Sequence, residues 1–585
     1  MRSLRFTLSS LHGRNLLGRC AGSSQQALRK VANHHDQPEK EQPNHRQSKW
    51  SAVYIAAIGV AGLTIPILGY KKAHALQKDV KNNSKLSETR FSRKDVAQHD
   101  SLDKGVWITY KGRVYDITNF IQHHPGGSHT IMMGAGGDVE PFWQTYTVHE
   151  ALEVQRLLSS YQIGVLLDEE SQQESAQIPP ETNGPYASDP HRNQLLNVLT
   201  NQPFNAETPS KLLVPTFETP AEVFFVRNHL PVPEVDLSEY KFSICIGTDG
   251  DPDGQEVVAE YTLDDLKRKF KPHTIDCVIQ CSGNRRSDLK KIREIKGLDW
   301  SVGAVGNASW TGVRLVDLLE SLKLRQTESI KHVQLQGLDC DMSGQSYGAS
   351  ISADVAFDPK REVLLAYEMN GQPLTRDHGF PLRFVAPGIT GARNVKWLSK
   401  LILSHEESTS HWQRNDYKSF SPNVDMFNLD YKQSVSIQEM PVQSAICDPI
   451  DGETVKLKLD AVGTKPRIPI RGYAYSGGGK MIVRVDVSVD GGDNWITANL
   501  DDLPYLEDGS PDFTNRNRTW SWTRWSTSIV VPDAIIEAKQ GRMKILCRAF
   551  DSSYNSQPER AETIWNVRGV VNNSWHAINV SLLLS

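Results

Sequence analysis

One stretch decides the fold of the first compact region: residues 106–127, which read VWITYKGRVYDITNFIQHHPGG. His124 opens the run H-P-G-G, and His149 follows 25 residues later. The Pro-Gly-Gly sequence favours a tight turn that lets the backbone approach a planar group closely. Two imidazoles can hold a haem iron, one on each face of the ring, when apolar walls exclude water. The candidate walls are Phe120, Ile121, Ile131, Phe142 and Trp143.

A histidine taken alone is more often a surface or packing residue than a ligand, and His123 and His129 could be mistaken for one. The string GRVYDITNFIQHHPGG nevertheless closely resembles the cytochrome b5 family. The resemblance implies an α+β haem-binding domain over residues 88–167. It also implies a b-type haem with His124 and His149 as its axial ligands.

A second motif lies at residues 278–286, VIQCSGNRR. A strand-like run delivers Cys281 into a Gly-Asn turn that is followed by two arginines. Thiolate is a soft ligand suited to a transition metal, and neighbouring cations favour the thiolate form. Arg285 and Arg286 could also bind an oxyanion with planar, bidentate geometry. On these residues alone, a buried structural thiol beside a surface basic pair is an equally good interpretation.

Four further stretches carry a resemblance to the sulfite oxidase family: FFVRNHLPVPE at 224–234, GLDW at 297–300, LLAYEMNGQPLTRDHGFPLRFVAPGITGARNVKW at 364–397, and SHWQRNDYKSFSP at 410–422. The resemblance implies oxidation of sulfite to sulfate by oxygen-atom transfer at a molybdenum–molybdopterin centre. Electrons would pass singly through the haem to cytochrome c, as the final step of sulfur amino-acid degradation. Nitrate reductases share the molybdenum domain but place the haem domain after it, so the order here favours sulfite.

The resemblance also implies roles for individual residues. Cys281 would be the protein thiolate on molybdenum. The sulfite pocket would include Arg227, Arg286, Trp300 and Tyr417, and Arg524 is a further candidate of uncertain alignment. The pterin contacts would be Phe225, Val226, Arg227, Asn228, His229, Asp339, His378, Arg383, Asn394, Val395 and Lys396.

Composition along the chain predicts a multidomain organisation. Residues 168–190 are rich in Pro and polar residues and poor in large apolar ones, which predicts a flexible hinge. Residues 191–434 mix β-rich runs with helical ones, such as 263–270 and 314–322, and predict a mixed α/β molybdenum-cofactor domain. Residues 437–585 contain short alternating strands, such as KMIVRVDVSV at 480–489, and predict an all-β Ig-like sandwich. By resemblance, this sandwich pairs two subunits into a homodimer.

The first 72 residues predict targeting. Residues 1–35 contain basic but no acidic side chains, and 1–49 has the composition of a mitochondrial transit peptide and a polar segment. Residues 50–70 run for 21 positions without a charge and end at Lys71 and Lys72, so 50–72 predicts a stop-transfer or transmembrane segment. This arrangement indicates the mitochondrial intermembrane space.

The formal net charge of −4 gives no basic excess, so a nucleic-acid partner is not expected. Two competing functions remain open on the sequence. One is a nitrate reductase-like molybdenum oxotransferase. The other is a haem electron-transfer protein whose molybdenum domain is silent.

Overall fold

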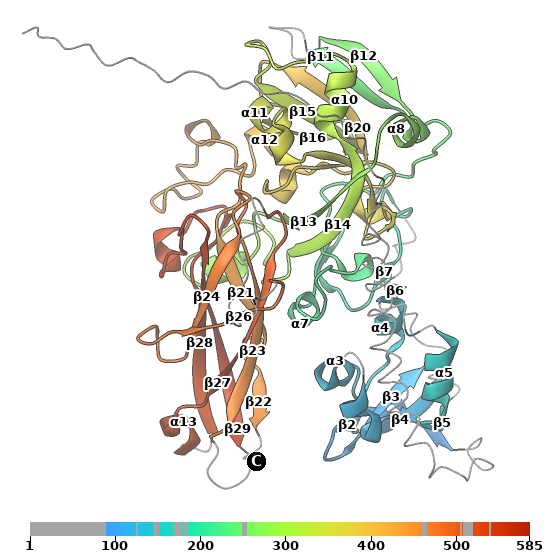
Figure 1. Cartoon of the computed structure of the whole chain (residues 1–585), viewed down its shortest axis with the longest axis vertical. Coiled ribbons are helices and arrows are strands. Elements are labelled where there is room, and N and C mark those ends of the chain that lie inside the picture. The colour runs from blue at the N-terminus through green and yellow to red at the C-terminus, as the bar shows by residue number, and fades with distance from the viewer. Residues whose placement is uncertain are drawn as a thin grey trace, which may run out of the picture. The chain divides into compact units, whose positions relative to one another are not determined.

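The computed structural model describes residues 89–584, apart from 125–126, 146–148, 150, 168–176, 179–183, 248–253, 458–464, 504–505, 507–518 and 538–539. The predicted transit peptide, the hydrophobic segment 50–72 and most of the predicted hinge lie outside the described residues. Within the described part of the chain, no helix is both long and apolar enough to cross a membrane. Figure 1 labels the elements.

The first region is a small sheet covered by short helices. The sheet order is β1-β5-β4-β3-β2. The turn between β3 and β4 consists of Lys111 and Gly112, both at positive φ, as a two-residue hairpin requires. The strands are β1 (Arg90–Phe91), β2 (Asp100–Ser101), β3 (Gly105–Tyr110), β4 (Arg113–Asp116) and β5 (Gln162–Leu166). The helices are α2 (Arg93–Ala97), η2 (Thr118–His123), α3 (Ser128–Met132), α4 (Glu140–Thr145) and α5 (Leu152–Ser159).

The second region contains two five-stranded sheets, β12-β11-β20-β15-β16 and β13-β14-β17-β18 with β19 paired to β17, beside a three-stranded sheet β10-β9-β8 and the pair β6–β7. Its strands are β6 (Gln177–Ile178), β7 (Arg192–Asn193), β8 (Asn197–Asn201), β9 (Phe204–Glu207), β10 (Val226–Arg227), β11 (Phe242–Gly247), β12 (Gln255–Tyr261), β13 (His273–Gln280), β14 (Val305–Arg314), β15 (His332–Cys340), β16 (Ser346–Ser352), β17 (Leu364–Met369), β18 (Gln372–Pro373), β19 (Arg383–Val385) and β20 (Leu398–Ser404).

The helices of this region are short. They are α7 (Ser210–Leu213), η4 (Ala221–Val223), α8 (Leu263–Lys269), α9 (Arg286–Lys290), α10 (Leu315–Ser321), α11 (Ala353–Ala356), η5 (Pro359–Arg361), η6 (Arg376–His378), η7 (Gly391–Arg393), α12 (His411–Arg414) and η8 (Tyr431–Gln433). Two of them, α8 and α10, confirm the helical runs expected at 263–270 and 314–322. A capping box of Thr262 and Asp265 begins α8.

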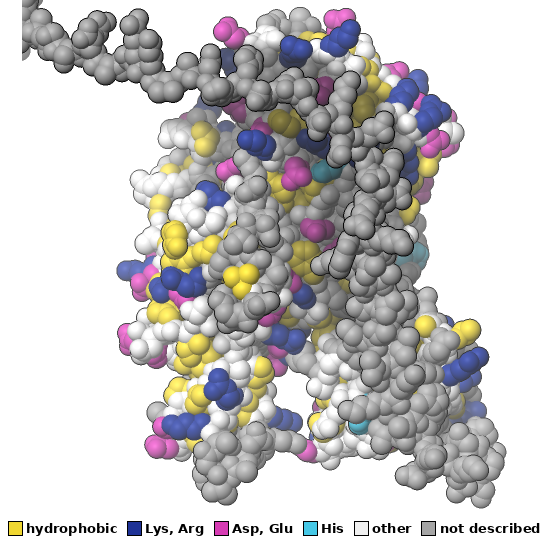
Figure 2. Space-filling view, viewed as in Figure 1, with side chains coloured by type: hydrophobic (Ala, Val, Ile, Leu, Met, Phe, Trp, Pro, Cys, Tyr) yellow, Lys and Arg dark blue, Asp and Glu magenta, His cyan; other side chains and the backbone are white. Residues whose placement is uncertain are grey.

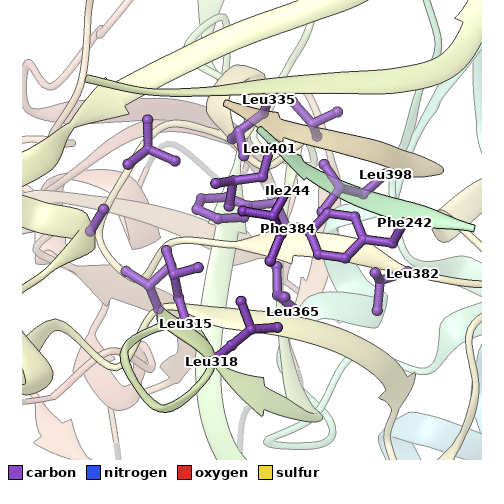
Figure 3. Packing of buried hydrophobic residues seen from close by; sticks show 14 of the residues in the cluster. Phe242, Ile244, Leu315, Leu318, Leu335, Leu365, Leu382, Phe384, Leu398 and Leu401 are labelled. Atoms are coloured by element: carbon purple, nitrogen blue, oxygen red, sulfur yellow. The ribbon is translucent and has the colours of Figure 1, made fainter. Parts of the chain in front are cut away.

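The core of the second region lies between its two larger sheets. Phe242 and Ile244 of β11 and Leu401 of β20 pack with Leu365 of β17 and Leu318 of α10, and all of these side chains are buried (Figure 3). Burying this much apolar surface fixes both sheets, so the loops at their ends hold their side chains in defined places. The predicted mixed α/β class is confirmed.

The third region is a sandwich of two sheets, β21-β23-β27-β26 and β22-β29-β28-β24-β25. Its apolar core includes residues of both sheets, such as Ile470 and Trp525 of the first and Val485 and Ile545 of the second. The all-β prediction is confirmed. Its elements are β21 (Gln443–Asp448), β22 (Thr454–Leu457), β23 (Arg467–Tyr475), β24 (Ile482–Ser488), β25 (Ile496–Thr497), β26 (Asn499–Leu500), β27 (Thr523–Val530), α13 (Asp533–Glu537), β28 (Gln540–Asp551), η9 (Ala561–Thr563) and β29 (His576–Leu584).

Charged side chains of both signs alternate over the described part of the face seen in Figure 2. The acidic excess of the chain is therefore not gathered into one patch on that face.

Candidate functional site

Two histidines of the first region face each other across a gap. The ring planes of His124 and His149 are parallel to within 2°, and their centroids lie 6.1 Å apart. Nitrogens that each bind a metal at about 2 Å must themselves be about 4 Å apart, and the ring centres lie farther back. The spacing therefore fits one iron held between the two imidazoles.

The surroundings of His124 prepare it as a metal ligand. Its Nδ1 lies 3.1 Å from the carbonyl oxygen of Gly127, a contact that leaves Nε2 to point away. Burial lowers the pKa of His124, which favours the neutral ring. Phe120 packs edge-on against His124, and the ring of Trp143 lies 5.3 Å from that of His149. All five predicted wall residues belong to the apolar cluster of this region or pack against it.

Cys281 follows the last residue of β13, as the strand-like run predicts. Its backbone N–H donates to the carbonyl of Ala304, and its side chain is buried. Gly283 donates its backbone N–H toward the sulfur at 3.4 Å. A Cβ at Gly283 or at Gly297 would meet the guanidinium of Arg286, so a larger residue at either position would displace that side chain from its present place.

A cavity next to Cys281 collects most of the predicted pterin residues. The space between its lining residues, including the opening to solvent, is about 670 Å³. Ten of the eleven predicted pterin residues line it; Val226 does not, because its side chain packs in a small apolar core with Phe204 and Leu212. The lining residues that were not predicted include Phe224, Tyr347, Asp377 and Trp397.

The cavity presents buried polar groups that lack partners within the described protein. Asp339 Oδ1 and Arg383 Nε form no hydrogen bond there. Burial raises the pKa of Asp339 to about 7, and it lowers that of Lys396 to about 7 and that of Arg383 to about 9. Such groups need a bound partner, and their mixture of cations and an acceptor fits a pterin that carries a phosphate.

Two of the four predicted sulfite residues line the cavity, and the other two lie behind its lining. Arg227 and Tyr417 line the cavity together with Cys281. Burial opposes the charged form of Arg227, but the fields of Tyr417 and Cys281 raise its pKa. Tyr417 Oη lies 2.6 Å from Nε2 of His229, and burial raises the pKa of Tyr417 to about 12. The tyrosine is therefore a neutral hydroxyl beside a cation.

Arg286 and Trp300 are placed behind the lining rather than in it. Arg286 donates to the carbonyls of Leu298, Arg568 and Gly569 at 2.9–3.1 Å. Trp300 is fully buried, and its Nε1 has no hydrogen-bond partner within the described protein. Arg285 does not line the cavity, where it could bind an oxyanion as the motif suggested: it donates to the carbonyls of Ser574 and Trp575 and pairs with the carboxylate of Asp288.

Comparisons with known proteins match each region. The family model described as "Cytochrome b5-like Heme/Steroid binding domain" matches residues 92–167, "Oxidoreductase molybdopterin binding domain" matches 229–412, and "Mo-co oxidoreductase dimerisation domain" matches 434–582. The mitochondrial sulfite oxidase of Rattus norvegicus is 45% identical over 86% of this chain and 86% of its own length. That of Drosophila melanogaster is 41% identical over 92% of this chain and 93% of its own length.

The chain belongs to the sulfite oxidase family. It is a molybdenum-dependent oxidoreductase with a molybdopterin cofactor and a b-type haem, as the sequence predicts. The nitrate reductase of Hordeum vulgare is also similar, at 33% identity over 66% of this chain and 42% of its own length. The sulfite oxidase relatives therefore match more of the chain, and more closely.

One cation near the pocket of this sulfite oxidase family member was not predicted. Arg568 bonds through Nη2 to the carboxylate of Asp416, the residue before Tyr417. Its Nε is buried without a partner within the described protein, and its charge helps to lower the pKa of Arg286 after the larger effect of burial. Arg524, the candidate from sequence, instead makes a bidentate pair with Asp502 in the sandwich and does not line the cavity.

Proposed function

We propose that the chain oxidises sulfite to sulfate at molybdenum bound by Cys281, and that it passes the electrons singly through the haem to cytochrome c. The observation that carries the proposal is the convergence of Cys281, Arg227 and Tyr417 on one buried cavity. Relatives named mitochondrial sulfite oxidase support the substrate and the organelle. The intermembrane space follows from the composition of residues 1–72, which lie outside the described residues.

The bound molybdenum–pterin would supply oxygen-atom transfer and accept two electrons. The chain's own residues bind and orient the substrate. Arg227 offers a cation for an anion such as sulfite in a site from which most water is excluded. With its proton on Nε2, His229 donates to the oxygen of Tyr417, and the tyrosine O–H is then available to the anion. Arg286 and Arg568 add positive charge from behind the lining.

Three loops hold most of the residues that would contact the pterin. Asn394 and Lys396 follow η7, His378 ends η6, and Asn228 and His229 follow β10. His378 stays neutral, since burial lowers its pKa to about 4, and its Nε2 lies 2.9 Å from the carbonyl oxygen of Ala221. Arg383 and Lys396 provide the cations that a phosphate needs.

His124 and His149 would hold the haem iron, and the haem would supply one-electron transfer between the molybdenum site and the acceptor. Residues 168–190 would form the hinge that lets residues 88–167 reach that acceptor. The sandwich, residues 437–585, pairs two copies of the chain into a homodimer, which its match to a dimerisation family supports.

The test is sulfite-dependent reduction of cytochrome c by the purified protein and by a Cys281→Ser variant. We expect wild type to be active and the variant to lose activity while its haem spectrum is unchanged, because a serine hydroxyl does not replace a thiolate on molybdenum. Cys277→Ser is the matched control: Cys277 is buried in the same apolar cluster as Cys281, but it does not line the cavity, and burial raises its thiol pKa to about 12. We expect this control to retain activity.

Two outcomes would contradict the proposal. Activity retained by Cys281→Ser would remove the thiolate from the mechanism. Molybdenum-loaded wild type that ignores sulfite but oxidises a reduced dye with nitrate would assign the chain to the nitrate reductase-like reaction instead.

A further inference from the structure

A buried ion-pair network lies directly behind the pterin cavity. Arg192 donates through Nε and Nη2 to both carboxylate oxygens of Asp377, at 2.8 and 2.9 Å, and through Nη2 to Asp189 at 2.9 Å. The three side chains are 5%, 8% and 4% exposed. The guanidinium also stacks over Phe204 at 4.2 Å. Charge-assisted, bidentate hydrogen bonds between side chains that are this little exposed hold the three residues in fixed positions.

The network joins the end of the predicted hinge to the pterin site. Asp189 is the residue before the last of the range 168–190. The carboxylate oxygen that does not bind Arg192 accepts the backbone N–H of Val232 at 3.0 Å. Asp377 belongs to η6, which also carries the predicted pterin residue His378. The neighbouring Arg376 donates to the carbonyl of Ser188 at 2.7 Å. The same short helix therefore binds the C-terminal end of the predicted hinge and also lines the cavity.

Arg192 determines what Lys396 can pair with. The carboxylate of Asp377 is occupied by Arg192 and by the side-chain N–H of Asn228, which donates to it at 3.0 Å. The hydrogen bonds of the Lys396 ammonium therefore go to the backbone oxygen of Asp377, at 2.8 Å, and to the side-chain oxygen of Asn228, and the ammonium also lies 4.2 Å from the centre of the Trp397 ring. No carboxylate of the described residues forms an ion pair with it. Its charge remains available to the cavity.

We infer that Arg192 is a positioning residue for the molybdenum–pterin group: by holding the Asp377 carboxylate, it keeps the Lys396 ammonium available to the cofactor. This inference rests on the proposed function, since it concerns the same cofactor. Without Arg192, a buried carboxylate beside Lys396 would lack its partner and would capture the ammonium, because an unpaired buried charge is very costly. The anionic cofactor would then lose a cation.

The experiment uses the full chain produced in a host that makes the cofactor. Pterin and molybdenum per haem, and the rate of pterin release on dilution, are measured for Arg192→Gln, Arg192→Lys and Arg192→Gln/Asp377→Asn. We expect Arg192→Gln to release pterin roughly 10- to 100-fold faster, the range for removing a group that orients a ligand. Arg192→Lys should restore part of the retention. The double variant should also recover, because the amide that replaces the Asp377 carboxylate carries no charge to capture Lys396.

Arg524→Gln is the matched control, because it also removes a bidentate Arg–Asp pair, partly buried and located in the sandwich. It should lower thermal stability without changing pterin release. The inference is overturned if Arg192→Gln releases pterin as slowly as Arg524→Gln, or if the double variant is no better than Arg192→Gln, which would indicate a loss of stability alone. Wild type that contains haem but no pterin would contradict the proposed function itself.

Discussion

At the scale of a single residue, His576 links stability to pH. It is buried, its Nδ1 accepts the backbone N–H of Ile446 at 2.9 Å, and burial, helped by the charge of Arg285, lowers its pKa from 6.5 to about 3. As pH falls, the unfolded chain therefore binds a proton at this histidine before the folded chain does. The contribution of neutral His576 to the free energy of unfolding is complete above about pH 6.5 and is lost progressively toward pH 3. By pH 5 the loss is about 2 kcal/mol. In His576→Gln, which cannot be protonated, we expect the urea midpoint to fall less between pH 7 and pH 5; equal falls would contradict this.

At the scale of an element, the loop between β13 and α9 is held from outside by the sandwich. Arg285 adopts φ 61° in this loop and donates to carbonyls of Ser444 and Ser574 while pairing with Asp288. We expect Arg285→Ala to lower the free energy of unfolding by about 3 kcal/mol, because two buried carbonyls and the partly exposed carboxylate of Asp288 lose their donor, and to reduce molybdenum content through the neighbouring Cys281. Arg467→Ala, whose donor group is exposed on β23, should change neither quantity. Unchanged stability in Arg285→Ala would show that contacts within the loop, and not those with the sandwich, fix its conformation.

At the scale of the whole molecule, the two cofactors should act in sequence. In His149→Ala we expect the haem to be lost, while sulfite still reduces an artificial acceptor that takes electrons from the molybdenum site, because the two sites are built from separate regions of the chain. Cytochrome c reduction should fall to background. His123→Ala is the control: the Nδ1 of His123 lies 3.2 Å from the carbonyl oxygen of Asn119. Full cytochrome c reduction by haem-free protein would contradict the proposed electron route.

Local sequence patterns were sufficient to predict a site wherever the metal-binding residue is adjacent in sequence to the strand or turn that carries it. The H-P-G-G run with a second histidine predicted a haem site, and the structure brings the two rings face to face. The run VIQCSGNRR predicted a cysteine at the end of a strand, which β13 supplies. The family, the cofactors and the three fold classes could all be predicted because each has its own contiguous motif or periodicity.

Contacts between distant segments were decided only by the tertiary structure. Arg568 lies 287 positions after Cys281, yet its charge reaches Arg286, and nothing in the sequence around it indicates this. Arg524 matched the expected residue type but is held by Asp502. Arg192 and Asp377 are 185 residues apart. Sequence patterns record which residues can bind a metal or an anion, whereas the pairing of buried charges depends on which surfaces the packed cores bring together, and that is a property of the whole fold.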